Sequence, residues 1–304
     1  MSKPLVLIGG LAADDRERVR DFALRLQAPV YAEPLSGLRE DLALRHLHVF
    51  NERMLARGRF DEVIRIGNVP TLRFWRDVKL PTAHYTRLPF AGLDHGEALP
   101  LDALPSLPPP VPRDRAFFDE DRARAARLQQ ILDEEPQSEL AMFRTLSREL
   151  PQGARIYIGN SLPIREWDLA ATRDPRGFTI EANRGANGID GQLSTFFGWC
   201  RPGADNIAIL GDLTALYDLN APWIVPRLEA GFRIIIINNG GGRIFSRVSS
   251  LQPLAAPFRE RVIENAHALH FGDWARMFGI EITELTPDAE ASRRVWARYD
   301  ALWS

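Results

Sequence analysis

The chain has 304 residues, which is long enough for two domains, and 45% of its side chains are hydrophobic. Its 38 basic and 40 acidic side chains nearly cancel, which excludes the strong positive charge of a nucleic-acid-binding or membrane-surface protein. The apolar runs fall well short of the ~20 residues of a membrane span, and residues 5–10 are too short for a signal sequence. The single cysteine, Cys200, excludes an internal disulfide framework. We therefore expect a reducing, cytoplasmic location, no membrane span, no nucleic-acid partner and a packed thiol.

Residues 1–105 alternate short apolar runs with amphipathic stretches, which is typical of a doubly wound α/β domain. Strands are expected at residues 4–10, 28–31 and 62–67, and helices at residues 16–26, after a cap at Asp14 or Asp15, and 72–78. Gly9 and Gly10 lack the further glycines of a dinucleotide-binding loop, so we interpret them as a plain turn. His46 and His48 lie two positions apart and cannot share a helix face, so a solvated pair is expected rather than a metal site.

A proline-rich stretch divides the chain. Residues 100–112 contain six prolines, which rules out a regular helix and indicates an extended linker. Residues 119–132 then show a charged amphipathic pattern, so we interpret residues 106–135 as a linker with a connecting helix. Residues 136–304 resume the alternation of strands and helices and are expected to form a second, mostly parallel α/β domain.

Four expected strands of the second half each end in polar or glycine residues. They are residues 155–158, 178–182, 207–210 and 233–237. The last two are continuous apolar runs, as parallel strands buried on both faces are. If all four strands are parallel, their carboxyl ends meet at one rim, which is where open α/β sheets bind ligands.

Asp212 and Asn239 end two consecutive strands, 27 positions apart, and so reach the same rim. A carboxylate and an amide oxygen suit magnesium, which keeps coordination sites free for phosphate oxygens. Three glycines, residues 240–242, offer bare N–H groups that an anion can approach. Two other interpretations are that Asp212 is a helix N-cap and that Asn239-Gly240 is a hairpin turn. The lack of alternation in residues 234–237 argues against the hairpin, whereas the pattern alone leaves the cap open.

Four motifs narrow the choice: Gly159-Asn-Ser-Leu-Pro163, Asn183-Arg-Gly-Ala-Asn-Gly-Ile-Asp-Gly191, Gly211-Asp-Leu-Thr-Ala-Leu-Tyr-Asp-Leu-Asn220 and Arg243-Ile-Phe-Ser246. A Gly-Asp pair with Asn-Asn about 27 residues later is similar to the thiamine-diphosphate binding motif. In their order and spacing, the four motifs resemble the 2-succinyl-5-enolpyruvyl-6-hydroxy-3-cyclohexene-1-carboxylate synthase (MenD) family of menaquinone biosynthesis. The close match covers about residues 159–246.

The resemblance implies a middle α/β domain followed by a diphosphate-binding domain, with thiamine diphosphate held through Mg²⁺, or alternatively Mn²⁺. It implies as metal ligands Asp212, Asn239 and the Gly241 carbonyl. The cofactor-binding residues that it implies are Ile189, Gly211, Asp212, Leu213, Thr214, Asn239, Gly241 and Ile244. Ile189 matches the apolar residue that props the cofactor into its bent form. On the substrate side, the resemblance implies catalytic roles for Ser161, Arg165 and Arg184, and contacts from Arg73 and Phe245.

The resemblance also implies two anionic substrates, 2-oxoglutarate and isochorismate, and guanidinium groups bind carboxylates bidentately. The family uses a glutamate on a pyrimidine-binding domain that precedes the middle domain. This sequence is expected to start at the middle domain and to lack that glutamate. We therefore expect the chain to be inactive alone and to work in a homo-oligomer or with a pyrimidine-domain chain.

Two other functions stay open. The chain could be another thiamine-diphosphate decarboxylase or synthase of 2-oxoacids, although Arg165 and Arg184 favour a dianionic acceptor. It could also be a non-catalytic cofactor-binding or assembly module, which the missing pyrimidine domain favours. His267 and His270 could share a helix face, but the sequence offers no further ligand beside them, so we interpret them as structural.

Overall fold

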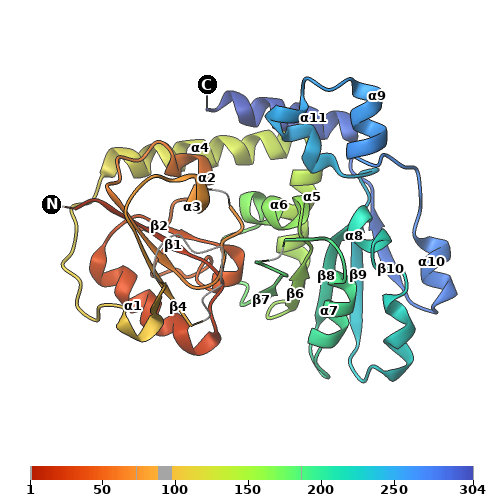
Figure 1. The fold of residues 1–304 in the computed structure, drawn as a ribbon, viewed down its shortest axis with the longest axis horizontal. Helices are drawn as coiled ribbons and strands as arrows, with labels where there is room; N and C mark the ends of the chain where they lie inside the picture. The colour runs from red at the N-terminus through yellow and green to blue at the C-terminus, as the bar shows by residue number, and fades with distance from the viewer. Residues whose placement is uncertain (1, 73, 88–97, 186, 304) are drawn as a thin grey trace. The chain divides into compact units, whose positions relative to one another are not determined.

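A computed structural model of the chain describes residues 2–72, 74–87, 98–185 and 187–303 (Figure 1). The chain forms two compact units. Unit 1 comprises Met1–Glu135, Asp168–Gly177 and Val295–Ser304, and unit 2 comprises Pro136–Trp167 and Phe178–Arg294. Each unit is built around its own sheet, and each is described separately below.

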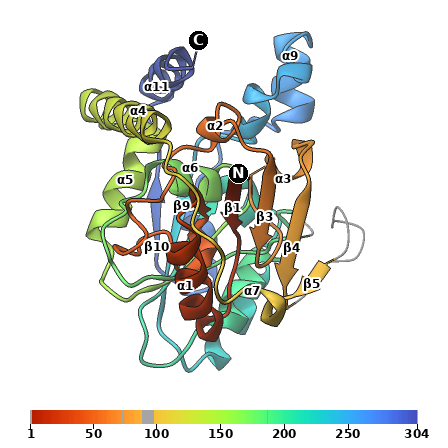
Figure 2. The ribbon, with the colours of Figure 1, turned by 90° about the vertical axis from the view of Figure 1, so that its left-hand side faces the viewer.

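In the described part of unit 1, five parallel strands form a sheet in the order β2-β1-β3-β4-β5. The strands are β1 (Pro4–Ile8), β2 (Val30–Ala32), β3 (Glu62–Ile66), β4 (Thr82–Thr86) and β5 (Ala98–Pro100). Figure 2 shows β1, β3 and β4 side by side. In the register, Val6 of β1 lies between Val30 of β2 and Ile64 of β3.

Both faces of this sheet are covered, because successive residues of β1 enter different cores. Val6 and Ile8 pack in one core with Phe22 from one helix, whereas Leu5 and Leu7 pack in a second core with Phe117 from another. The helical segments of unit 1 include η1 (Ala13–Asp15), α1 (Arg16–Leu26), η2 (Pro34–Ser36), α2 (Glu52–Leu55), α3 (Phe74–Asp77), η3 (Leu101–Ala103) and α4 (Arg115–Glu134). The doubly wound α/β class expected for this part of the chain is therefore confirmed.

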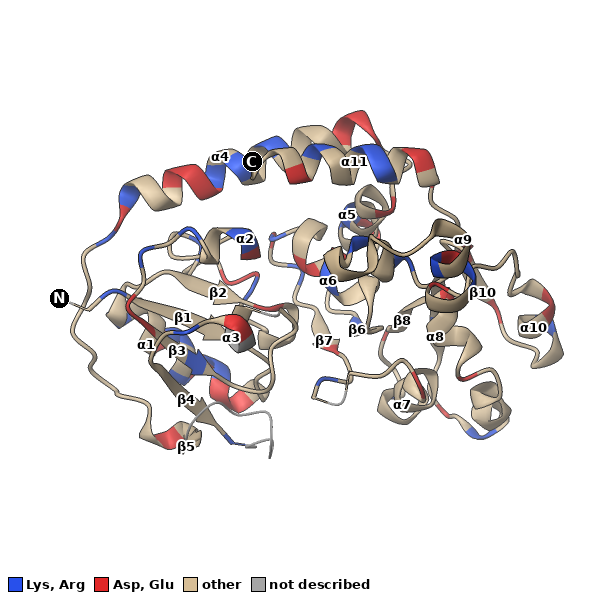
Figure 3. Cartoon of the chain, turned by 45° about the horizontal axis from the view of Figure 1, so that its top comes forward, with Lys and Arg blue, Asp and Glu red and all other residues tan. Residues whose placement is uncertain are grey.

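The helix α4 explains the charged amphipathic pattern after the prolines. Asp114 caps it by accepting a hydrogen bond from the Phe117 N–H at 3.1 Å, as N-cap residues do. Figure 3 shows basic and acidic residues along its length. Its apolar residues Phe118, Leu128 and Ile131 are buried.

Two expectations for unit 1 were wrong. Asp15 does not cap α1 through its side chain; its buried carboxylate accepts hydrogen bonds from Arg87 at 2.6–2.8 Å instead. His46 is exposed, but His48 is buried, because its backbone forms a bridge with Val30 at the edge of the sheet. The pair is therefore not solvated as a whole.

In unit 2, five described parallel strands form a sheet in the order β10-β9-β8-β6-β7. The strands are β6 (Arg155–Ile158), β7 (Thr179–Glu181), β8 (Asn206–Gly211), β9 (Phe232–Ile237) and β10 (Ile282–Leu285). The chain runs from β6 to β7 at one edge and then returns to β8 on the other side of β6. The topological switch point therefore lies between β6 and β8, and ligands of open α/β sheets bind at the carboxyl ends of such strands.

Residues of alternate parity in these strands face opposite sides, and both sides are buried. Tyr157, Leu210 and Ile236 pack with Phe196 and Phe271 in one core, and Ile158, Ile209 and Ile237 are also buried. The helical segments that begin in unit 2 include α5 (Glu139–Glu149), α6 (Leu162–Ala170), α7 (Gln192–Trp199), α8 (Asp212–Leu216), η4 (Ala221–Arg227), η5 (Arg243–Arg247), η6 (Ser249–Leu251), α9 (Ala256–Phe258), η7 (Arg259–Ile263), α10 (Gly272–Met277) and α11 (Ala289–Ala301).

The connection from β8 to β9 is not a single continuous helix. The helix α8 ends at Leu216, and a 3-10 segment, η4, follows with Pro222 near its start and Pro226 inside it. Proline lacks the N–H that an α-helix needs in its interior, so Pro226 favours the shorter 3-10 turns. Within the described ranges, the helices are all too short or too polar to cross a membrane.

Candidate functional site

A cavity of about 280 Å³ lies in unit 2, where the carboxyl ends of the strands meet. Its walls come from the segments after β6, β8 and β9, from residues 187–190, and from Glu139 of α5. Nine of the residues singled out from the sequence line it: Ser161, Ile189, Gly211, Asp212, Leu213, Thr214, Asn239, Gly241 and Phe245. The four polar strand ends that were expected to share a rim belong to parallel neighbouring strands, as that expectation required.

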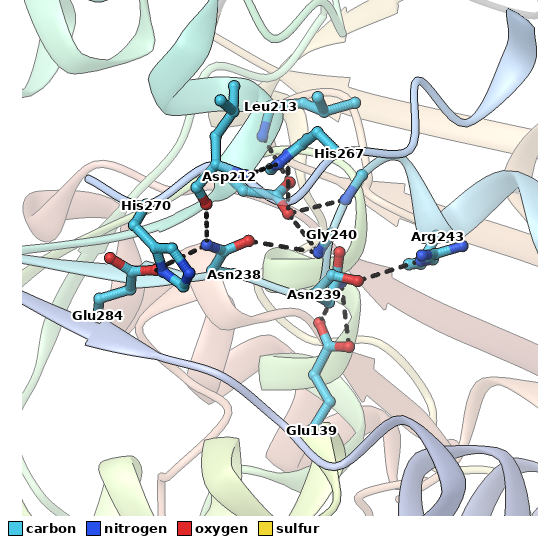
Figure 4. Close-up of polar contacts among 12 residues, drawn as sticks. Glu139, Asp212, Leu213, Asn238, Asn239, Gly240, Arg243, His267, His270 and Glu284 are labelled. Carbon is cyan, nitrogen blue, oxygen red and sulfur yellow. Dashed lines mark hydrogen bonds and ion pairs between the residues drawn. The ribbon is translucent and has the colours of Figure 1, made fainter. Parts of the chain in front are cut away.

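Asp212 is held in place by the glycines that follow β9. Its Oδ2 accepts hydrogen bonds from the Gly240 N–H at 2.8 Å and the Gly241 N–H at 2.9 Å (Figure 4). Gly241 has φ +130°, and a Cβ there would lie 2.6 Å from the Glu264 carbonyl oxygen, so a side chain would be excluded. Asp212 is the first residue of α8 and not its cap, which settles the alternative left open by the sequence.

The glycine N–H groups are not bare, contrary to the expectation from the sequence. Gly240 and Gly241 donate to Asp212, and Gly242 donates to the Glu264 carbonyl oxygen at 2.6 Å. Their hydrogen bonds position the carboxylate, so they are not available to an anion in this arrangement. The hairpin interpretation of Asn239-Gly240 is also wrong. A hairpin joins antiparallel strands, whereas β9 pairs in parallel with both β8 and β10.

Asn239 presents an amide oxygen without a hydrogen-bond partner in the described part of the chain. Its Nδ2 donates to both carboxylate oxygens of Glu139, at 2.9 and 3.1 Å (Figure 4). Its Oδ1 is buried and lacks a hydrogen-bond partner among the described residues. A buried amide oxygen without a partner costs free energy unless something else binds it.

These groups fit a hard cation. Asp212, Asn239 and the Gly241 carbonyl supply oxygen ligands only, which is the chemistry that Mg²⁺ prefers. The Gly241 carbonyl accepts a hydrogen bond from the Arg243 N–H at 2.8 Å, which leaves one of its two lone pairs. The described residues contain no cluster of three His, Cys, Asp or Glu side chains able to hold a metal. Mg²⁺ usually needs only one or two carboxylates when water and phosphate complete its shell.

Two buried glutamates lie beside Asn239, and the sequence did not reveal either. Glu139 is 5% exposed, and burial together with the charge of Asp212 raises the pKa of its carboxyl to about 7. Glu166 of α6 is fully buried and lies against Glu139. Burial and the neighbouring Glu139 charge raise the pKa of Glu166 well above its usual range. Neither glutamate stands near Asn239 in the sequence, so no local pattern could have found them.

His267 is a third neighbour of the site whose role the sequence did not reveal. Its Nε2 lies 3.5 Å from Asp212 Oδ2, and its backbone N–H donates to the Gly240 carbonyl. Its Nδ1 accepts a hydrogen bond from the Leu269 N–H at 3.2 Å, so in the neutral ring the proton is on Nε2, facing Asp212. His270 lies elsewhere and contacts Glu284 at 2.9 Å.

The loop of residues 183–191 is tied to the end of β6 by Asn160. The Asn160 amide donates to the carbonyls of Asn183 at 2.9 Å and Gly188 at 2.7 Å, and its oxygen accepts from Arg184 at 2.8 Å. Gln192 adds a bond to the Gly188 carbonyl at 2.7 Å. The next residue, Ser161, has φ +72°, a conformation that is strained for a non-glycine residue and is enriched at functional sites.

Arg165, Arg184 and Ile244 are not among the residues that line the cavity. Arg165 donates to the Ser161 carbonyl, and Arg184 donates to Asn160, as described above. Ile244 lies in η5 and is half-buried. Arg73 lies outside the described residues.

A parallel α/β unit with an oxygen-lined cavity at its switch point is the arrangement of an open-sheet, ligand-binding protein. No protein-family model matches the chain. Individual proteins do: the chain is 37% identical to the 2-succinyl-5-enolpyruvyl-6-hydroxy-3-cyclohexene-1-carboxylate synthase of Bdellovibrio bacteriovorus, over 99% of this chain and 62% of that protein. It is 36% identical to the synthase of the same name from Akkermansia muciniphila, over 91% of this chain and 54% of that protein.

A third synthase of that name, from Roseiflexus sp., is 35% identical over 59% of this chain. The chain therefore resembles these synthases along nearly its whole length, which confirms the resemblance predicted from the four motifs. It spans 62% and 54% of the lengths of the first two relatives.

Proposed function

We propose that this chain forms part of a thiamine-diphosphate-dependent synthase of menaquinone biosynthesis. The proposed enzyme removes carbon dioxide from 2-oxoglutarate and adds the remaining succinyl unit to isochorismate. The observation that carries the proposal is the pair formed by Asp212 and Asn239, whose oxygens line one cavity at the switch point of the sheet. The similarity to the three synthases supports it independently.

In this proposal, unit 2 holds the diphosphate end of the cofactor. Asp212, Asn239 and the Gly241 carbonyl bind Mg²⁺ or Mn²⁺, and the cation binds the phosphates. Gly211, Leu213, Thr214 and Ile244 contact the cofactor, and Ile189 supports its bent form. When bound, thiamine diphosphate supplies the electron sink for decarboxylation of a 2-oxoacid, and the protein binds and orients it.

Ser161, Arg165 and Arg184 are proposed to serve the anionic substrates, with Phe245 and Arg73 as further contacts. The two guanidinium groups carry charge at every relevant pH and suit carboxylates. Each is anchored to the strand end after β6, by Ser161 or Asn160. This anchoring would limit the freedom of the side chains before substrate arrives.

The remaining parts of the proposal concern the rest of the enzyme. Residues 1–105 would correspond to a middle domain and residues 136–304 to the diphosphate-binding domain. A pyrimidine-binding domain, in the same protein or in a partner chain of a homo- or hetero-oligomer, would supply the catalytic carboxylate. The proposal keeps the cytoplasmic location expected from the sequence.

Removal of the Asp212 carboxylate tests the cation site. We expect Asp212→Ala to lower the affinity for thiamine diphosphate in the presence of Mg²⁺ by ~10-fold or more, because the cation loses a ligand. Calorimetric titration with and without Mg²⁺ measures the difference. Asp212→Asn keeps an acceptor for the glycine N–H groups and so controls for misfolding, and Asp205→Ala, an exposed site before β8, is the matched control. Equal Mg²⁺-dependent affinity in wild type and both Asp212 variants would remove the assignment.

A further inference from the structure

The cation site needs Asn239 in one of two amide orientations. The oxygen and nitrogen of an asparagine amide have nearly the same size, so a half-turn exchanges a cation ligand for a hydrogen-bond donor that repels cations. Asn239 is only partly buried, and its Oδ1 lacks a hydrogen-bond partner that would hold it among the described residues. The orientation must therefore be fixed from the Nδ2 side.

Glu139 is the group on that side. Both of its carboxylate oxygens lie within hydrogen-bond distance of Asn239 Nδ2, at 2.9 and 3.1 Å (Figure 4). An ionised carboxylate only accepts hydrogen bonds, and those bonds are stronger than bonds between neutral groups. A half-turn of the Asn239 amide would bring its oxygen against two acceptor oxygens with no proton between them.

The Glu139 side chain is itself held in place. Glu139 is the first residue of α5. The preceding residue, Ser138, caps this helix, because its Oγ accepts a hydrogen bond from the Ala141 N–H at 3.3 Å. The Glu139 N–H donates to Ser292 Oγ at 2.9 Å. Its carboxylate has little solvent around it, because the residue is 5% exposed and the fully buried Glu166 lies against it.

We infer that Glu139 is a positioning residue: it holds the Asn239 amide with Oδ1 turned away from itself, toward the cation. The inference rests on the proposed function and deepens it. Glu139 itself is not a cation ligand in this arrangement, and its effect passes through Asn239. The inference adds a carboxylate from α5, 100 positions before Asn239, to the cation site.

The test is a double-mutant cycle on cation affinity. Free Mn²⁺ is counted by electron paramagnetic resonance in titrations of the full chain with thiamine diphosphate at pH 8. We expect Glu139→Ala to weaken Mn²⁺ binding by ~10- to 100-fold, the usual effect of removing a group that orients a metal ligand. Glu149→Ala, an exposed glutamate of the same helix, is the matched control and should bind as wild type does.

The second arm replaces the amide that needs orienting. Asn239→Asp offers an oxygen on either side, so Glu139→Ala in that background should not weaken Mn²⁺ binding, and loss of the carboxylate repulsion should strengthen it. Equal weakening in both backgrounds would show that Glu139 acts through its charge or through folding, and would overturn the inference. Glu139→Gln, which keeps the shape and one acceptor oxygen, replaces Glu139→Ala if the alanine variant is misfolded, and should then weaken binding several-fold.

The same titrations separate the inference from the proposed function. If the wild type binds Mn²⁺ together with thiamine diphosphate and Glu139→Ala binds it equally well, only the inference fails. If the wild type shows no Mn²⁺ binding that depends on thiamine diphosphate, the proposed function fails and the inference with it.

Discussion

His48 is buried in unit 1 near several arginine side chains. Its burial lowers its pKa well below the usual value, and the charges of Arg173, Arg39 and Arg122 lower it further. Arg122 also donates to the His48 carbonyl oxygen at 2.8 Å, and Arg39 donates to the carbonyl oxygens of Asp168, Ala171 and Thr172 at 2.8–3.0 Å. Protonation of His48 would place another positive charge among these groups.

This environment predicts a pH dependence of stability. The folded protein disfavours the charged imidazole, whereas the unfolded chain takes up the proton below pH ~6.5, so His48 costs stability as pH falls below that value. Relative to a variant without a titrating group at this position, the free energy of unfolding should fall by at most ~1.4 kcal/mol per pH unit below that value. The free energy of unfolding is measured in urea at pH 7.5 and 5.5, with hydrogen exchange of β1 as the probe. Between the two pH values it should decrease less for His48→Phe than for wild type.

The comparison with His48→Phe removes the contributions of the neighbouring acids. Burial raises the pKa values of Asp168, Asp121 and Glu40, so these carboxyl groups act in the opposite direction in both proteins. His46→Phe, at an exposed position, should behave as wild type does. An identical loss of stability in wild type and His48→Phe would contradict the prediction.

The sequence could reveal the site residues that directly follow strands, but not those that lie on helices or in long loops. Asp212 and Asn239 directly follow buried strands, and parallel strands bring such positions together. Glu139 reaches the same place from the first turn of α5, and His267 from a segment after η7. Their positions depend on how helices and loops pack on the sheet, and no periodicity encodes that packing.

Residues 187–190 of the loop 183–191 give the cavity one wall, and the side chains of Asn160 and Gln192 both donate to the Gly188 carbonyl oxygen. Asn160 provides two donors to loop carbonyls and one acceptor to Arg184. The Asn160 side chain is almost fully buried, so water cannot easily replace these hydrogen bonds. The loop should therefore be sensitive to this one residue.

Asn160→Ala should release the loop. The variant removes both amide donors, although Gln192 still donates to the Gly188 carbonyl oxygen. A lost hydrogen bond costs ~1 kcal/mol, which corresponds to about fivefold faster amide exchange where the loop opens locally. Hydrogen exchange with mass spectrometry on peptides that cover residues 183–191 measures the effect. Asn160→Asp keeps the acceptor for Arg184 and loses both donors, so it should also exchange faster, whereas Asn220→Ala, at an exposed site, should not. Unchanged exchange in both Asn160 variants would show that the loop is held by other contacts.

The central strands of unit 2 could be predicted well, because their burial on both faces produces unbroken apolar runs. β4, β5 and β10 were not expected from the sequence, because most of their residues are only half-buried and form no such run. β6 matches its expected bounds, and β8 and β9 extend the expected runs by one or two residues. The connection between β8 and β9 could not be predicted as well. Its two prolines are compatible with a kinked α-helix or with 3-10 turns, and the packing against the sheet decides between them.

The two compact units are interleaved along the chain. Asp168–Gly177 and Val295–Ser304 belong to unit 1, although both follow segments of unit 2 in the sequence. Within unit 1, Arg39 helps to hold the first of these segments, because it donates to the carbonyl oxygens of residues 168, 171 and 172. The proline-rich stretch, residues 100–112, lies inside unit 1, and the first change of unit comes only after Glu135. The changes of unit depend on long-range contacts of this kind, which composition does not reveal.

In our proposal, the described carboxylates that line the cavity in unit 2 serve the cation site or face solvent. Three described carboxylates line it, from Glu139, Asp190 and Asp212. Asp212 is held by glycine N–H groups, Glu139 is held by Asn239, and Asp190 is exposed. An enzyme of the proposed kind needs a further carboxylate at the opposite end of the cofactor, and in our proposal a pyrimidine-binding domain provides it.

We therefore expect the polypeptide of residues 1–304 to bind thiamine diphosphate and Mg²⁺ weakly and to release no carbon dioxide from 2-oxoglutarate above background. Addition of a separately expressed pyrimidine-binding domain should restore turnover if the two parts assemble. Carbon dioxide release is measured with labelled 2-oxoglutarate, and cofactor binding in the same samples shows that the chain is folded. Asp212→Ala mixed with that domain is the control and should stay inactive, because the cation has lost its carboxylate ligand. Robust decarboxylation by residues 1–304 alone would contradict the prediction. It would assign the acid–base role to a carboxylate within this polypeptide, and Asp190 and Glu139 would be the first to test by substitution.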